Sequence, residues 1–186
     1  METFRAEING FIVNLEVETK LKEHERTILY SAVRHMASRL GSTDFNYFCN
    51  IFSYEKKITT GKWWWKKTTA TCVNNFKKPN GRTRKQIYSH LMNGAETLSP
   101  TPNRQADITL RVDRRNKKNV LGYTYANSPK QWVYSWLLKT DYKRVAGNLA
   151  HEWVHKMGYG HAYRWNNTRQ YTVPYAVGDY VAGIMR

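Results

Sequence analysis

Three histidines and one glutamate fall within eleven residues, in the order His151-Glu152-x-x-His155-x-x-Gly158-x-x-His161. Residues four apart on an α-helix lie one above the other, so His151 and His155 can bind one metal ion. Gly158 stands where a helix ends in a left-handed residue, after which the chain can fold back and bring His161 to the same ion. Three protein ligands with one open position are typical of catalytic zinc, so the pattern predicts one Zn²⁺ per chain.

The glutamate of this pattern is not one of the predicted ligands. Glu152 comes off the same helical turn as His151 and can reach a water molecule on the metal, which predicts a general base. Zinc lowers the pKa of such a water and polarises a carbonyl group, so the predicted reaction is hydrolysis. The alternative is a helix with three ordinary histidines, but five fixed positions coincide in a chain of 186 residues.

The whole pattern resembles the metzincin clan of zinc-dependent endopeptidases. This resemblance implies an α+β, zincin-like fold, with a twisted mixed β-sheet, an N-terminal helix and a central zinc-binding helix. Only 25 residues follow His161, so any C-terminal subdomain is very short. The resemblance also implies that a protein or peptide substrate lies along an edge strand. We expect this strand at Leu121, Gly122, Tyr123, Thr124 and Tyr125.

The chain departs from the metzincin pattern after the third histidine. Metzincins have a methionine in a tight turn beneath the metal, and Met185 is the single methionine after His161. However, residues 174–185 predict a helix, with Pro174 in its first turn and an apolar stripe that includes Met185. A helix and a tight turn exclude each other at this position, and the helix is favoured.

Some metzincins use a tyrosine near the metal as an extra ligand or oxyanion donor. Tyr175 is the first candidate here, and Tyr163 and Tyr171 are the next two. For each of the three, simple packing is the alternative.

The elements that must position these residues fit one catalytic domain over 1–186, because the chain is too short for a second domain of ordinary size. Alternating apolar residues predict a hairpin around Asn9-Gly10, and a stripe over 21–40 predicts the N-terminal helix. The other expected elements are a short helix over 82–92, strands over 106–113, 120–125 and 132–138, and a buried metal-binding helix that begins at Thr140 or Asp141.

Residues 45–74 predict two strands around Thr60-Gly61, as an elaboration of the domain. The turn is followed by Trp63, Trp64 and Trp65. We expect a core hairpin with lysine stems over the rings. The alternative is an exposed cluster that stacks on bases or sugars, or holds a peptide.

The two cysteines of the chain fall in the same segment. In the expected register Cys49 lies opposite Cys72, within disulfide range. In a cytoplasmic protein both would stay reduced.

The formal charge of +16 is unevenly distributed. Residues 1–25 hold six acids and three bases, whereas residues 56–95 hold ten lysines or arginines and no acid. The basic region 56–85 predicts an anionic partner, such as nucleic acid, an anionic glycan, lipid headgroups or an acidic protein. The alternative is a solvated basic surface that aids solubility.

The sequence therefore favours a zinc-dependent endopeptidase. One alternative is a zinc protease or hydrolase associated with nucleic acid or another polyanion, and the other is a non-catalytic binding module with structural zinc. A structural site would usually close its fourth position with Cys or His, and none follows at ligand spacing. We expect no transmembrane segment. The first residues lack the order of a signal peptide, so we expect a cytoplasmic protein unless another route releases it; the sequence specifies no oligomeric state.

Overall fold

A computed structural model describes residues 1–62, 64–115, 117, 119–125, 127–162, 166 and 168–184. The elements in chain order are β1 (Glu2–Ile8), β2 (Phe11–Val17), α1 (Glu23–Leu40), α2 (Thr43–Ile51), β3 (Tyr54–Thr60), β4 (Lys67–Val73), α3 (Arg84–Asn93), β5 (Gln105–Asp113), β6 (Gly122–Thr124), β7 (Lys130–Tyr134), the 3-10 turn Leu137–Lys139, α4 (Tyr142–Lys156), the 3-10 turn Arg169–Tyr171 and α5 (Val173–Ala182).

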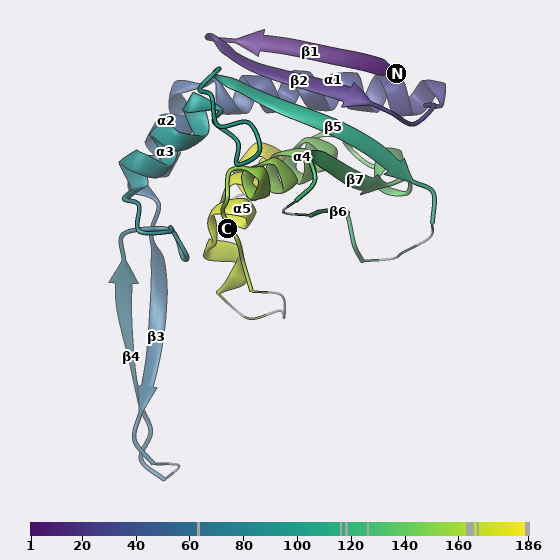
Figure 1. The fold of residues 1–186 in the computed structure, drawn as a ribbon. Coiled ribbons are helices and arrows are strands. Elements are labelled where there is room, and N and C mark those ends of the chain that lie inside the picture. Colours follow the sequence, from purple (N-terminus) through teal and green to yellow (C-terminus); the bar gives the residue numbers. More distant parts are fainter. Residues whose placement is uncertain are drawn as a thin grey trace.

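The main sheet is mixed and has the strand order β1-β2-β5-β7-β6. Strands β2, β5 and β7 run parallel, whereas β1 and β6 pair antiparallel with β2 and β7. Helices α1 and α4 pack on each other, with α1 against β1 and β2 and α4 against β5 and β6 (Figure 1). The α+β class, the mixed sheet and the N-terminal helix that we predicted are therefore confirmed.

The predicted N-terminal hairpin is confirmed, with a two-residue turn between β1 and β2. Asn9 and Gly10 have φ of 51° and 73°, as a type I′ turn requires. The Asn9 side chain donates a hydrogen bond to the carbonyl of Gly41, directly after α1 (2.9 Å). A Cβ on Gly41 would lie 2.3 Å from the carbonyl oxygen of Ile8, so only glycine lets the helix end so close to the turn.

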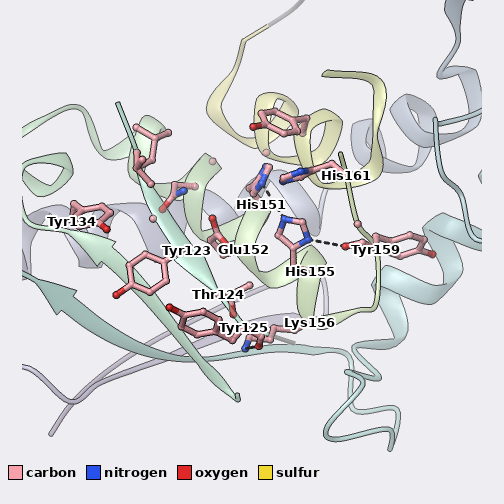
Figure 2. Close-up of a pocket in the computed structure, with 18 of the residues that line it drawn as sticks. Tyr123, Thr124, Tyr125, Tyr134, His151, Glu152, His155, Lys156, Tyr159 and His161 are labelled. Carbon is pink, nitrogen blue, oxygen red and sulfur yellow. Dashed lines mark hydrogen bonds between the residues drawn. The ribbon is translucent and has the colours of Figure 1, made fainter. Parts of the chain in front are cut away.

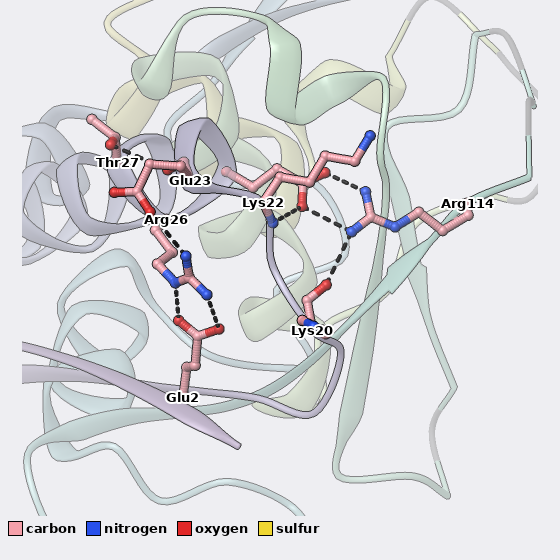
Figure 3. Close-up of polar contacts among 8 residues, drawn as sticks. Glu2, Lys20, Lys22, Glu23, Arg26, Thr27 and Arg114 are labelled. Atoms are coloured by element: carbon pink, nitrogen blue, oxygen red, sulfur yellow. Dashed lines mark hydrogen bonds and ion pairs between the residues drawn. The ribbon is translucent and has the colours of Figure 1, made fainter.

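The first turn of α1 is fixed to the sheet by ion pairs (Figure 3). Glu25 is buried and binds the guanidinium of Arg114, which directly follows β5. Burial acts to raise the pKa of Glu25, but the hydrogen bonds from Arg114 and from the Lys22 N–H outweigh it, and the pKa is lowered. Arg26 likewise forms an ion pair with Glu2 of β1, in which its Nε lies 2.6 Å from a carboxylate oxygen.

The predicted strand at the start of 45–74 is wrong, because residues 43–51 form α2. The Ser42 hydroxyl accepts a hydrogen bond from the Phe45 N–H and caps this helix. Phe45 and Cys49, four apart, are the buried residues of α2. A short aromatic run fits either period, and here the cap and the packing of α2 against α3 favour the helix.

A hairpin is nevertheless present, formed by β3 and β4. Its strands are joined by six residues, 61–66, and not by the predicted two-residue turn. The expected core packing of this hairpin is wrong. All described residues from 56 to 72 are exposed, and Trp63 lies outside the described residues. Among the described residues, the Lys62 ammonium lies 5.8 Å from the centre of the Trp64 ring.

The predicted register, with Cys49 opposite Cys72, is also wrong. Cys49 is buried in α2, whereas Cys72 is exposed in β4 and lies opposite Glu55. Both thiols are free.

The remaining predicted elements are confirmed with small shifts. Helix α3 ends at Gly94, which has the left-handed φ of 68°. The predicted strand over 132–138 is shorter, because Leu137 begins a 3-10 turn. Helix α5 matches the predicted helix from Pro174, and Met185 lies outside the described residues. Within the described residues, none of the helices has the length and apolar character needed to cross a bilayer.

Candidate metal centre and active-site cleft

Helix α4 carries the first part of the predicted site and lies in the centre of the fold. The Asp141 carboxylate caps it by accepting a hydrogen bond from the Lys143 N–H (3.0 Å), as the sequence predicted. Most of its surface packs against α1 and α5. Its buried apolar side chains are Val145, Ala146, Leu149, Ala150, Trp153 and Val154. The remaining edge of the helix presents two histidines and a glutamate to a cleft.

The turn after α4 reverses the chain toward the helix. Gly158 has φ of 85°, and its N–H donates to the carbonyl of His155 (3.0 Å). This left-handed residue brings the carbonyl of Tyr159 onto the ring of His155, where it accepts a hydrogen bond from Nδ1 (2.7 Å). Figure 2 shows His161 returning beside the other two histidines. The expected role of Gly158 is therefore confirmed in its backbone conformation.

The rings of His151, His155 and His161 lie together and are called the ligand group below. Their ligand nitrogens all lie within 4.8 Å of one another, and the Nε2 atoms of His151 and His155 are 3.3 Å apart. The Nδ1–H of His161 donates to the carbonyl of Ala162 (3.0 Å), and His151 has a backbone hydrogen bond to Pro174. Backbone carbonyls thus orient each ring through one nitrogen and leave the other within the group, where that of His161 also lies 3.4 Å from the Arg169 guanidinium. The group can hold a metal ion.

Burial keeps these histidines neutral. It lowers the pKa of His151 far below the usual value, lowers that of His155 to about 4 and lowers that of His161. The mutual repulsion of the rings acts in the same direction for His151 and His155. Neutral imidazole is the form that binds a metal, so a metal need not displace protons from these rings.

Glu152 lies on the same wall of the cleft and is 6% exposed. Burial raises the pKa of its carboxyl group to about 7, against the opposing effect of the Lys156 charge. It does not belong to the group of ligand atoms around the histidines. The structure therefore places Glu152 where a proton acceptor could serve the cleft, beside the ligand group and not in it.

Helix α5 forms the floor beneath the histidines. Its Tyr175 ring lies 4.5 Å from the ring centre of His151 and 5.0 Å from that of His161. Of the other two tyrosines, Tyr171 stacks on Tyr54 instead (4.9 Å), and Tyr163 lies outside the described residues. Tyr175 is thus the tyrosine that the structure brings to the ligand group.

The cleft has a volume of about 1560 Å³ and borders the predicted edge strand. Strand β6 is the last in the sheet order, and the whole segment 121–125 lines the cleft. Figure 2 shows Tyr123, Thr124 and Tyr125 on the side of the cleft facing the histidines. A Cβ on Gly122 would lie 2.5 Å from the Trp132 carbonyl oxygen of β7 and 2.6 Å from the Asn148 side chain of α4, so a glycine lets this strand approach both β7 and α4.

Lys156 is a site residue that the sequence did not indicate. Its side chain is buried, and its ammonium donates to the carbonyls of Ser128, Lys130 (3.0 Å) and Tyr125 (3.3 Å). Tyr125 and Ser128 lie between β6 and β7, and Lys130 is the first residue of β7. The residue after His155 thereby fixes the edge strand, and only the unusual place of a lysine on a buried helix could have singled it out.

Arg169 is a second residue that the sequence did not indicate. Its Nη2 lies 3.4 Å from Nε2 of His161, and its guanidinium carbon lies 4.9 Å from the centre of the Tyr175 ring. It also lines the cleft. This places a positive charge beside the ligand group, on a 3-10 turn that no local pattern marks.

Comparison of the chain with protein-family models, with curated proteins and with solved structures yields no match. The interpretation of the site therefore depends on its own geometry.

Proposed function

We propose that the protein is a zinc-dependent endopeptidase with a metzincin-like fold. The observation that carries the proposal is the group of three histidine nitrogens within 4.8 Å of one another, in the wall of a cleft that also contains Glu152 and an edge strand. A hydrolase acting on extended chains needs these parts together: a Lewis acid, a base and a backbone to bind.

Zinc fits the donor set. Three imidazoles are common zinc ligands, and tetrahedral zinc with Zn–N bonds of about 2.0–2.1 Å requires its nitrogens to be about 3.3 Å apart. The Nε2 atoms of His151 and His155 are 3.3 Å apart. When bound at such a site, zinc lowers the pKa of a coordinated water and polarises a carbonyl group.

Three residues of the cleft then have roles in the reaction. Glu152 takes a proton from the attacking water and returns it to the leaving amine, for which its pKa of about 7 is suitable. Tyr175 and Arg169 lie beside the ligand group and donate to the oxygen that becomes negative in the transition state.

The proposed substrate is a protein or peptide that binds as an added strand. Strand β6 is at the edge of the sheet, so its outer backbone groups can pair with an extended chain. Residues 121–125 border the same cleft as the histidines, which supports a substrate strand at this position.

A non-catalytic module with structural zinc is less well supported. Within the described residues, the ligand group contains three histidines and no fourth Cys, His, Asp or Glu. Structural zinc sites are closed by four protein ligands, whereas a site with three leaves a position for water. The anionic partner expected for residues 56–85 is a separate proposal, because none of the described residues in this range lines the cleft.

The deciding experiment compares two variants on the best substrate of a peptide library. Glu152→Gln keeps the shape of the side chain but not its basicity, and we expect it to retain zinc and lose about 10²–10⁴ in kcat. His155→Ala should lose zinc and activity together. Turnover like wild type in Glu152→Gln, at full zinc content, would rule out the proposed mechanism.

A further inference from the structure

Strands β3 and β4 form an arm, defined here as residues 54–73. Figure 1 shows it standing away from the sheet and the helices. Every described residue from 56 to 72 is exposed, on both faces of the ribbon. An isolated two-stranded ribbon has little stability of its own and buries no core, so the fold does not explain its composition.

The arm is positively charged along its length. It contains Lys56, Lys57, Lys62, Lys66 and Lys67, all exposed, against the single acid Glu55. Neighbouring residues of a strand point to opposite faces, so Lys56 and Lys57 lie on different faces of the ribbon. The charge continues past the root of the arm, where Lys78 and Lys85 are also exposed.

The tip of the arm combines this charge with aromatic surface. Trp64 and Trp65 are 63% and 61% exposed, and the Lys62 ammonium lies 5.8 Å from the Trp64 ring centre. Large exposed rings between lysines suit ligands that have both flat faces and negative charge.

We propose that the arm binds single-stranded nucleic acid, with phosphates along the lysines and unpaired bases stacked on Trp64 and Trp65. Positive charge that follows a backbone, together with aromatic stacking platforms, is the usual basis of such binding. Either DNA or RNA supplies this chemistry.

An anionic membrane accounts for less of the arm. If the tip contacted a bilayer, Lys56 would stand roughly 15 Å behind it, at about 3.3 Å per residue. This exceeds the Debye length of about 8 Å at physiological ionic strength, so Lys56, Lys57 and the lysines at the root would contribute little. A flexible polyanion can follow the arm and contact all of them. Base-paired duplex is less suitable, because its bases are not free to stack on the tryptophans.

The test measures the fluorescence anisotropy of labelled oligodeoxythymidine and oligouridine of equal length with the full chain, over a series of salt concentrations. We expect Trp64→Ala with Trp65→Ala to weaken binding roughly 10-fold or more without changing the salt dependence. Replacement of Lys62, Lys66 and Lys67 by Gln should weaken binding and reduce the slope of log K against log salt by about 2. The two oligonucleotides show whether DNA or RNA is preferred.

A matched control removes the same charge elsewhere. Replacement of Lys20, Lys139 and Lys143, also exposed, by Gln should leave the slope unchanged. Melting temperature, zinc content and peptide turnover should be the same in all these variants, so the result is independent of the proposed peptidase activity.

Three outcomes would overturn the proposal. The first is the absence of oligonucleotide binding at low salt. The second is an equal loss in the arm variants and the control variant. The third is tryptophan-dependent sedimentation with phosphatidylserine vesicles but no binding of either oligonucleotide, which would assign the arm to membranes instead.

Discussion

Gly147 of α4 and Gly178 of α5 lie backbone against backbone, directly beside His151. A Cβ on Gly147 would be 2.7 Å from the Gly178 carbonyl oxygen, and a Cβ on Gly178 would be 3.1 Å from the Cβ of His151. No side chain fits between the two helices here. The floor of the ligand group is therefore set by helix backbone and not by an interchangeable side chain.

Gly178→Ala should accordingly separate α4 and α5 and move the His151 ring. We expect a free energy of unfolding lower by about 1–3 kcal/mol, as for overpacking in a core, and weaker zinc binding. Thermal melting and competition with a chromogenic zinc chelator measure the two effects. Gly160→Ala is the matched control, since a Cβ there meets no atom of the described residues within 4 Å. Equal behaviour of the two variants would show that the close helix contact is not needed.

Lys156→Met should uncouple the edge strand from the metal-binding helix. The variant keeps most of the buried volume but loses the donors to the carbonyls of Tyr125 and Ser128, which follow β6, and of Lys130, which begins β7. We expect zinc content to be kept and KM for extended peptides to rise roughly tenfold, because strand pairing needs a fixed edge. Steady-state kinetics test this, with the exposed Lys139→Met as control. An unchanged KM would mean that peptides do not pair with β6.

Arg169→Ala should reduce kcat by about 10²-fold, the usual cost of removing one donor to a developing oxyanion. Zinc binding should not weaken, because the guanidinium lies near His161 as a positive charge and not as a ligand. Arg169→Lys should restore part of the rate. Arg144→Ala, which changes another arginine of the cleft, should have little effect. A loss of zinc in Arg169→Ala would instead assign Arg169 a structural role.

Glu96→Gln should change how stability depends on pH. Burial raises the pKa of Glu96 to about 7, although its carboxylate accepts hydrogen bonds from the Trp153 ring (2.9 Å) and the Asp107 N–H (3.1 Å). The negative charge of Asp107 raises this pKa further, and the positive charge of Lys156 lowers it. Between pH 4.5, the ordinary pKa of the group, and about pH 7, the carboxyl group of Glu96 is therefore protonated in the folded protein but ionised in the unfolded chain. The resulting stability is complete below pH 4.5 and is lost as the pH rises through 7.

The amide introduced by Glu96→Gln cannot titrate, yet its oxygen can accept the same hydrogen bonds, so the substitution should remove this dependence. We expect the variant to be more stable than wild type by roughly 2 kcal/mol at about pH 8 and nearly equal to it at about pH 4.5. Urea unfolding at both pH values measures the difference. A constant difference between the two would show that Glu96 does not titrate in this range.

The ligand group could be predicted because its geometry is local. Helical spacing joins His151 to His155, and the left-handed Gly158 turns the chain back to His161, all within eleven residues. The edge strand at 121–125 was also predictable, from its resemblance to a known order of elements. Lys156 and Arg169 were not, because their roles depend on carbonyls and rings that the fold brings from distant segments.

The prediction of a strand at residues 45–52 was wrong for a different reason. The aromatic residues of this segment satisfy both a strand period and a helix period, so periodicity alone does not decide between them. The decision comes from the contacts of Phe45 with Tyr88 of α3 and Tyr180 of α5, whose rings lie 5.8 Å and 5.3 Å away. Once this segment is helical, Cys49 turns into the core and cannot meet Cys72.

The chain enters and leaves the arm at one place, because Tyr54 and Val73 are cross-strand partners. Because its two ends are already adjacent, the ribbon between them can be lengthened or shortened without moving α2 or α3. Selection on what the arm holds can therefore proceed separately from selection on the histidine cleft. The ligand of the arm can therefore change while the residues of the cleft stay the same.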